Sequence, residues 1–332
     1  MYSILQTIFK PLNRLQKNHI ALMHFTLKSP NPVSFIIQML IPVIFLATSS
    51  GCDKFEGTQT VPAYLQIDSV GFTTDYSTQG TGDQNFSDIW VFVDDDLIGG
   101  FEMPATIPVL AEGPHKLEIR PGIKLNGISE TRAPYPCIKP LIYDSFEFLA
   151  DSVVKAYGTT SYWENAVFVW MEDFEDASLA IHETTASDTN ISRTQPAGSS
   201  QAYIDEDSQY SGISYLDTGR DFLELVSDDG NGQGFVFDRG DYVFMELHYK
   251  TDVKVLVGFY ILTMDNTVED RAFLVINNTD EWKKIYVNFT PIVNETLDAV
   301  NFKVYFQAFL DPGDDSAMVL LDNIKLVTRP NL

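Results

Sequence analysis

Residues 242–262, YVFMELHYKTDVKVLVGFYIL, hold two successive runs in which apolar residues alternate with others. The first run places four side chains on one face: Val243, Met245, Leu247 and Tyr249. The second run places five on one face: Val253, Val255, Val257, Phe259 and Ile261. Because successive side chains of a β-strand point to opposite faces, an alternation of period two predicts half-buried strands. The stretch therefore predicts two consecutive strands that face a core.

Similar strands surround this stretch throughout residues 161–332. Residues 300–308 repeat the alternation, and no stretch keeps a helical apolar period for three turns. Strands are predicted at 166–171, 222–226, 235–237, 242–250, 253–262, 272–276, 282–289, 300–309 and 318–327. Many short strands separated by turn signals are typical of a β-sandwich or barrel.

Residues 61–160 predict a second and smaller sandwich, with its boundary at 157–165. Strands are expected at 61–70, 89–93 and 141–154. Between them, Asp94-Asp95-Asp96 predicts a tight turn, because aspartate tolerates an unusual φ and bonds its own backbone. Four prolines lie within 121–140 and remove backbone donors, so this segment predicts an ordered crossover and not a central strand. The predicted fold class is all-β, with two sandwiches in series.

Residues 33–52, VSFIIQMLIPVIFLATSSGC, precede the predicted sandwiches. The chain before Cys52 carries four basic residues and no acidic one. The apolar run at 35–46 would be roughly 18 Å long as a helix, against a hydrocarbon core of about 30 Å. A basic segment, an apolar run and then small residues are typical of a secretory signal peptide, here residues 1–51. A true start at Met23 would shorten this leader to 29 residues.

The segment Ser50-Gly51-Cys52 resembles the lipobox of bacterial lipoproteins, although Ser49 stands where that family usually has an aliphatic residue. A looser box is common in lipoproteins of Bacteroidota, which this chain resembles. Asp53-Lys54-Phe55-Glu56 is similar to the acidic signal that sends such proteins to the cell surface. The resemblance implies a signal peptide cut before Cys52, a palmitate-type lipid on that cysteine, and a tether at 52–60. It places the protein in the cell envelope, anchored in the outer membrane and exposed at the cell surface. A plain secretory signal and a transmembrane anchor remain the alternatives.

Two further resemblances concern the sandwiches. Residues 91–119 are similar to PEGA-type and related Ig-like modules, through Val93-Asp94, Ile98-Gly99 and Gly113-Pro114-His115. That family implies a small Ig-like module at 61–160 that spaces or binds. Residues 161–332 resemble the galactose-binding-like jelly-roll of carbohydrate-binding modules, through the Trp282 strand and the closing Leu321-Asp322-Asn323-Ile324. The second resemblance implies a jelly-roll that binds glycans.

Composition excludes some partners. Removal of the leader leaves 18 basic and 46 acidic residues, a net charge of −28. This charge repels polyanions, so we expect no nucleic acid partner and no basic patch for anionic lipid. If Cys52 carries lipid, Cys137 has no disulfide partner, and we expect it to be a packed apolar residue.

Two sets of candidate ligand-binding residues follow. Jelly-rolls of the resembled family often hold structural calcium between their first and last strands, and the matching residues here are Glu172, Asp173 and Asp322. The alternative is that these acids are exposed or cap turns. A glycan face needs exposed aromatics beside amides, and the residues expected to point outward are His248, Tyr260, Tyr305, Gln307 and Phe309. Outward aromatics can equally be strand formers or interface contacts.

Signatures of catalysis are missing from the sequence. His182-Glu183 lacks the second histidine of a zinc-protease helix, and there is no Gly-x-Ser-x-Gly elbow. We therefore expect a non-catalytic surface lipoprotein that binds glycan or another surface polymer. A structural component of an envelope or secretion assembly, in contact with envelope proteins, is the alternative. A glycoside-active enzyme is the remaining possibility, because its two carboxylates are recognised only in space.

Overall fold

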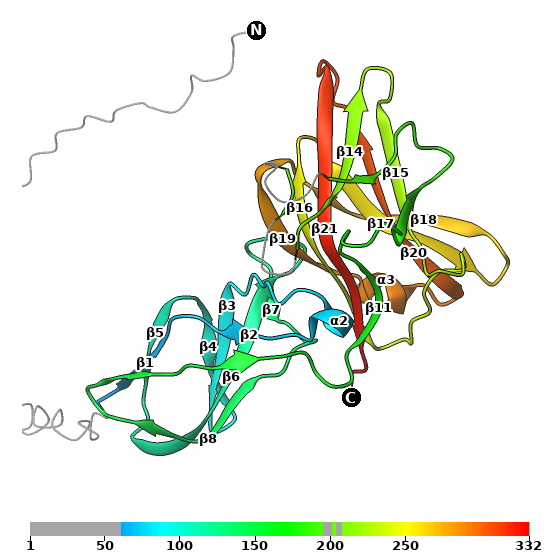
Figure 1. The fold of residues 1–332 in the computed structure, drawn as a ribbon. Helices are drawn as coiled ribbons and strands as arrows, with labels where there is room; N and C mark the ends of the chain where they lie inside the picture. The colour runs from blue at the N-terminus through cyan, green and yellow to red at the C-terminus, as the bar shows by residue number, and fades with distance from the viewer. Residues whose placement is uncertain (1–60, 195–200, 204–207, 332) are drawn as a thin grey trace, which may run out of the picture. The chain divides into compact units, whose positions relative to one another are not determined.

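The computed structural model describes residues 61–331 except 195–200 and 204–207 (Figure 1). The predicted signal peptide, Cys52 and the tether lie outside the described residues. Thr60–Leu332 forms one compact unit. Among the described residues, no helix is long and apolar enough to cross a membrane.

The N-terminal module is a sandwich of two sheets around its own apolar core. Its smaller sheet consists of β5 (Ala105–Val109), β1 (Ala63–Ile67) and β9 (Val153–Lys155). Its larger sheet consists of β4 (Asp96–Glu102), β3 (Asp88–Val93), β6 (Gly113–Lys124) and β7 (Arg132–Pro134), with β8 (Leu141–Phe148) also paired to β6. Leu65 and Ile67 of β1 are buried while Tyr64 is exposed, as the alternation predicts. A short ladder of β2 (Gly71–Phe72) and β10 (Thr159–Thr160) and the one-turn helix α2 (Tyr76–Gln79) complete this half.

Two local expectations had different outcomes in this module. The turn at Asp94 and Asp95 is confirmed, because both residues have positive φ angles, of 50° and 69°. The expected crossover at Pro121 is wrong, because β6 continues through this residue, which pairs with Ile89 of β3. The Pro121 carbonyl accepts from the Tyr135 amide, so its nitrogen faces the same side. On that side β8 has ended and β7 has not yet begun, so the missing N–H breaks no ladder bond.

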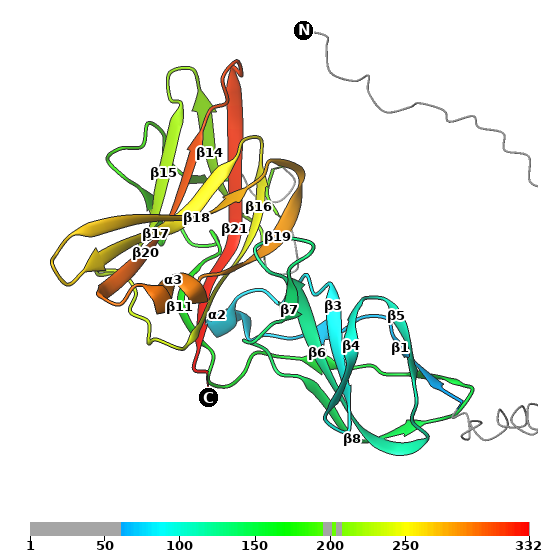
Figure 2. The same cartoon turned by 180° about the vertical axis from the view of Figure 1, so that it is seen from behind.

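The C-terminal module is a larger, jelly-roll-type sandwich (Figure 1). One sheet runs in the order β13 (Ser192–Arg193), β14 (Gly212–Asp217), β21 (Ser316–Arg329), β16 (Tyr242–Thr251) and β19 (Thr279–Asn288), with β11 (Val167–Glu172) paired to β21. The other runs in the order β12 (Ile181–Glu183), β15 (Phe222–Ser227), β20 (Ala299–Phe309), β17 (Val255–Thr263) and β18 (Val268–Ile276) (Figure 2). The helix α3 (Thr290–Glu295) follows β19. The all-β fold class with two sandwiches is confirmed.

The rows predicted from residues 242–262 face the core of this second sandwich. Val243, Met245 and Leu247 are fully buried, and so is the row from Val253 to Ile261. Tyr249 only packs against this core from its margin. The strand expected at 235–237 is reduced to one bridge between Phe235 and Phe302.

A third apolar cluster joins the two modules. It contains side chains from both: Phe86, Ile123, Tyr135, Cys137, Ile138, Tyr162, Phe244, Tyr286 and Val327. Cys137 is packed here as expected, and burial raises the pKa of its thiol to about 12. The modules are therefore held together by a continuous core.

Buried polar groups lie at the centre of this cluster. The hydroxyls of Tyr135 and Tyr162 both donate to Glu246 Oε1 at 2.7 Å, and Lys284 Nζ lies 3.1 Å from Glu246 Oε2. Burial disfavours the charged carboxylate, but the charges of Lys284 and Lys325 outweigh it and lower the pKa of Glu246 to about 2. The charged carboxylate of Glu246 is thus enclosed between the modules, and both of its oxygens have partners.

Candidate functional site

A cavity of about 690 Å³ lies where the N-terminal module meets strand β19. Its walls come from the segment before β3, the turn after β6, strand β16, the end of β18 with the turn that follows it, and strand β19. β19 is the edge strand of its sheet, and edge strands present unpaired backbone groups. The N-terminal module covers part of this edge, because Leu125 bridges to Tyr286 and the Asn126 amide donates to the Tyr286 carbonyl at 2.8 Å. Residues 282–286 of β19 also line the cavity.

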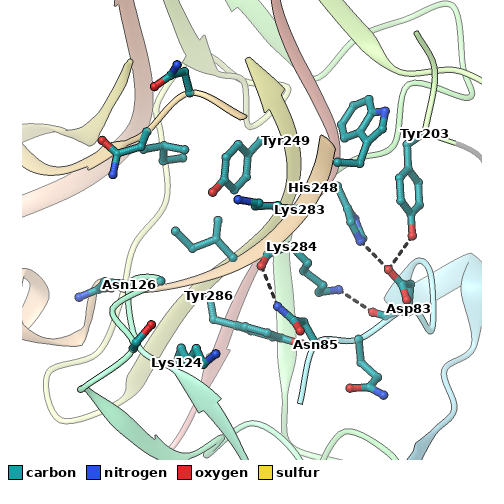
Figure 3. A pocket seen from close by; sticks show the side chains of 18 of the residues that line it. Asp83, Asn85, Lys124, Asn126, Tyr203, His248, Tyr249, Lys283, Lys284 and Tyr286 are labelled. Carbon is teal, nitrogen blue, oxygen red and sulfur yellow. Dashed lines mark hydrogen bonds and ion pairs between the residues drawn. The ribbon is translucent and has the colours of Figure 1, made fainter. Parts of the chain in front are cut away.

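Asp83 forms hydrogen bonds with three other side chains in one wall of the cavity. Its Oδ2 accepts from the Tyr203 hydroxyl at 2.6 Å and from His248 Nε2 at 2.7 Å (Figure 3). Its backbone carbonyl accepts from Lys284 Nζ at 2.6 Å. Burial opposes ionisation of this carboxyl, but the bonds to His248 and Tyr203 outweigh it and hold the pKa of Asp83 well below its usual value. Asp83 therefore remains a fixed anion that positions its neighbours.

Aromatic rings continue this wall. The Tyr203 ring stacks on His248 with centroids 4.3 Å apart, and its edge meets Trp282 at 5.6 Å. Burial is the main cause that lowers the pKa of His248, so its ring is neutral near neutral pH. Trp282 Nε1 is buried and has no hydrogen-bond partner in the described part of the chain. Tyr249 lies across from this group, beside Lys283 (Figure 3).

Several polar side chains of the cavity have nothing bound to them. Asn277 and Asn278 form the turn between β18 and β19, where asparagine is favoured because it tolerates turn geometry. Within the described residues, these two amides and the ammonium groups of Lys124 and Lys283 make no hydrogen bond or ion pair. These four groups are therefore available to a ligand.

The predicted glycan face is only partly assembled. Tyr260 of β17 and Tyr305, Gln307 and Phe309 of β20 lie on the outer face of the five-stranded sheet. His248 does not join them, because β16 belongs to the other sheet, where the residue lies under Asp83 and is 2% exposed. His248 does point away from the core of its own sandwich, as the alternation predicts, but the N-terminal module buries it.

The groups of this sheet face mostly bind one another. The Tyr260 hydroxyl donates to Glu224 Oε1, and the Gln307 amide donates to the same carboxylate oxygen at 3.1 Å. Tyr305 is fully buried and lies over Gly258, where an added Cβ would meet its ring at 2.6 Å. Phe309 is 60% exposed and stacks on Phe222 with centroids 4.5 Å apart. The face offers an aromatic surface but few unbound polar groups.

The predicted calcium ligands are also largely occupied. Glu172 accepts from the backbone amides of Phe174 and Ala180, and Asp322 accepts from the hydroxyls of Ser211 and Ser208 at 2.7 and 3.2 Å. Burial raises the pKa of both carboxyl groups above their usual values. No group of three His, Cys, Asp or Glu side chains among the described residues is placed to hold a metal ion.

The third predicted calcium ligand, Asp173, is also bonded, because its Oδ2 accepts from the Tyr76 hydroxyl at 2.9 Å and its Oδ1 from the Glu175 amide at 3.1 Å. Asp173 and Asn323 line a small cavity of about 120 Å³, and both side-chain polar atoms of the buried Asn323 lack partners in the described chain. Calcium takes 6 to 8 oxygen ligands. Asn323, which is not one of the three predicted ligands, holds a side-chain oxygen without a partner in the described chain. The calcium site stays a prediction.

Sequence reasoning did not identify the cavity itself. Trp282 was noted only as part of a resemblance, and Lys124, Lys283 and the asparagine pair were not considered. The sequence does hold one indication of a ligand-binding site, because the amides of Asn277-Asn278 stand four residues before the aromatic ring of Trp282. The covering residues come from another module, and no pattern along the chain shows which surface they cover.

No protein-family model matches the chain, and no curated protein matches it. Among solved structures, the CBM22-1 xylan-binding domain of Paenibacillus barcinonensis Xyn10C is 11% identical, covering 51% of this chain and 99% of that one, with a TM-score of 0.37. The family 11 carbohydrate-binding module of Clostridium thermocellum, solved with a mixed-linked tetrasaccharide, is 14% identical over 47% and 93%, with a TM-score of 0.32. A structure reported for carbohydrate-binding modules of the β-sandwich superfamily is 13% identical over 72% and 84%, with a TM-score of 0.33. The neighbours are carbohydrate-binding modules, but at these TM-scores neither ligand nor site residues carry over.

Proposed function

We propose that the protein binds a saccharide in the cavity between its two modules. The observation that carries this proposal is that aromatic rings and unbound amides line the same cavity, namely Trp282 and Tyr249 with Asn277 and Asn278. An aromatic ring offers a flat apolar face, against which the apolar C–H face of a sugar can pack. An amide offers both donors and acceptors to hydroxyl groups. The cavity volume also falls within the roughly 300–1,000 Å³ that is usual for small-molecule sites.

The arrangement of acids favours binding over hydrolysis. Glycosidases use two carboxyl groups across the scissile bond, one of which must donate a proton. Asp83 is the only acid among the described residues that line the cavity. Its pKa is held low and its carboxylate is committed to His248 and Tyr203, so it is a poor proton donor. A binding role therefore suits this cavity.

The proposal includes the location inferred from the sequence. We propose that Cys52 carries a lipid that anchors the chain in the outer membrane, with the modules at the cell surface. Cys52→Ala should abolish metabolic labelling by a fatty-acid probe, while Cys137→Ala should leave it unchanged. Labelling that persists in Cys52→Ala would contradict the lipid anchor.

Binding is tested with the full chain in detergent, first on a glycan array and then by calorimetry with the sugar class found. Trp282→Ala should weaken binding at least tenfold, which corresponds to about 1.4 kcal/mol. Phe309→Ala, on the outer face of the five-stranded sheet, is the matched aromatic control and should leave affinity unchanged.

Three results would decide between the sites. Loss of saccharide binding in Trp282→Ala alone supports a binding site in the cavity. Loss in Phe309→Ala alone would move the site to the sheet face. An array that stays blank would contradict saccharide binding and favour the assembly component, for which capture of envelope proteins is the next measurement.

A further inference from the structure

We propose that the cavity selects acidic saccharides, with Lys124 and Lys283 binding carboxylates of a uronic acid oligosaccharide; this rests on the saccharide binding proposed above. The chain has 46 acidic and 22 basic residues. The described lining of the cavity reverses this balance, because it holds three lysines and one aspartate. The aspartate is already bound by Tyr203 and His248. The net charge available to a ligand in the cavity is therefore positive.

The three lysines differ in what they already bind. Lys284 is committed, because its ammonium group pairs with Glu246 at 3.1 Å and donates to the Asp83 carbonyl at 2.6 Å. Lys124 and Lys283 have no partner among the described residues. Elsewhere in the chain many basic side chains are paired, as in the 2.6 Å contacts of Lys116 with Asp95 and of Arg220 with Asp217. This one cavity therefore holds two lysines whose ammonium groups are unpaired among the described residues.

The two lysines come from different modules. Lys124 is the last residue of β6 and Lys283 lies in β19. Figure 3 shows Lys283 beside Tyr249 on one side of the cavity and Lys124 on the other. An oligosaccharide with carboxylates on both of its sides would contact both modules.

The backbone around Lys124 is fixed relative to β19. The Asn126 amide donates to the Tyr286 carbonyl at 2.8 Å, and the Asn288 amide donates to Asn126 Oδ1 at 2.8 Å. The backbone segments that carry the two lysines therefore need no rearrangement when a ligand binds. A preorganised site spends less of its binding energy on ordering.

The rest of the lining explains why the acid should belong to a sugar. Tyr249 and Trp282 supply ring faces, and Asn277 and Asn278 supply amides for hydroxyl groups. Lysine acts as a point charge, and no arginine is among the described lining residues to bind an oxyanion through two parallel bonds. A carboxylate or a sulfate ester could meet the same charge, and the experiment separates them.

The test uses the full chain in detergent and three matched oligosaccharides of one length: galactose, galacturonate and a sulfated galactose. Calorimetry at low salt should show galacturonate binding at least tenfold more tightly than the neutral sugar. The difference should shrink as salt is raised, because screening weakens exposed charges. Lys124→Met and Lys283→Met should each lower the preference for galacturonate and leave neutral-sugar affinity within about twofold. Lys254→Met, an exposed lysine outside the cavity, should change neither.

Other results would overturn the inference in distinguishable ways. Equal affinities for the neutral and acidic sugars would reject acid selection but keep saccharide binding. Tight binding of the sulfated sugar alone would reject a carboxylate as the selected group. Absence of binding by all three, together with a blank array, would reject both proposals. Unchanged melting temperatures in the lysine variants would show that lost selectivity is not lost folding.

Discussion

The outer faces of the two jelly-roll sheets differ in what covers them. On the six-stranded sheet, Glu246 and His248 point away from the core and are almost fully buried. Their partners come from the N-terminal module, namely Tyr135 for Glu246 and Asp83 for His248. The outward residues of this sheet thus depend on a neighbour more than 100 residues away in the chain.

On the outer face of the five-stranded sheet, the acid Glu224 finds hydrogen-bond donors on the same sheet. Glu224 is bonded by Tyr260 and Gln307, which lie on neighbouring strands. Burial opposes the charge on Glu224, but these hydrogen bonds lower the pKa of its carboxyl group. Phe309 on the same face remains exposed. The comparison teaches that alternation sets the direction of a side chain, while the rest of the fold decides whether that direction leads to solvent.

Removal of the Glu246 carboxylate should have the largest effect. Glu246→Ala would leave the buried Lys284 without its counter-ion and two tyrosine hydroxyls without an acceptor. Loss of one partner of a buried ion pair costs about 3–5 kcal/mol, and urea unfolding measures it. Glu224→Ala on the other sheet is the matched control, with an expected loss of about 1–2 kcal/mol. Equal losses would contradict the contrast between the faces.

Acid should weaken the junction between the modules through the same carboxylate. The pKa of Glu246 is about 2 in the folded chain against an ordinary 4.5. Because the folded pKa is the lower one, the unfolded chain takes up the proton first as pH falls, and stability is lost. The stability advantage of the native chain over Glu246→Gln should be full above about pH 5 and decline towards pH 2. Urea unfolding at pH 6, 4 and 3 measures it, and an advantage that does not change with pH would contradict the assignment.

The sequence could predict the sheets because their signal is local. The rows beginning at Val243 and Val253 repeat every second residue, and that spacing alone fixes which side faces the core. The turn at Asp94 was equally local, since it follows from the residue type. Pro121 shows the limit, because its missing donor is harmless only where two other strands leave a gap.

The site could not be predicted because it is assembled from distant parts. Tyr203 and His248 are brought to Asp83 across 120 and 165 residues. Lys124 and Lys283 become a pair only when β6 ends beside β19. The ligand-binding candidates predicted from the sequence lie mainly on the outer face of the five-stranded sheet, whereas the residues of the cavity come together only through this packing.

A calcium test asks whether the six-stranded sheet binds a cation where the end of β11 meets the middle of β21. Asp173 and Asn323 share a small cavity there. A ligand that binds only the folded state raises its stability. If the predicted calcium is bound, EDTA should lower the melting temperature by about 2–4 °C, as expected for 1 kcal/mol at this size. Asp173→Asn should abolish the shift, and identical melting curves with and without EDTA would reject the site.

The smallest effect is expected on the open face. Phe309 is 60% exposed, and its main contact is the stacked ring of Phe222. Exposed substitutions away from special features usually change stability by less than about 0.5 kcal/mol. Phe309→Ala should therefore unfold in urea almost as the native chain does. A loss of more than about 2 kcal/mol in the free energy of unfolding would mean that Phe309 is covered. The outer face of the five-stranded sheet would then resemble that of the six-stranded sheet, and the contrast between the two would be wrong.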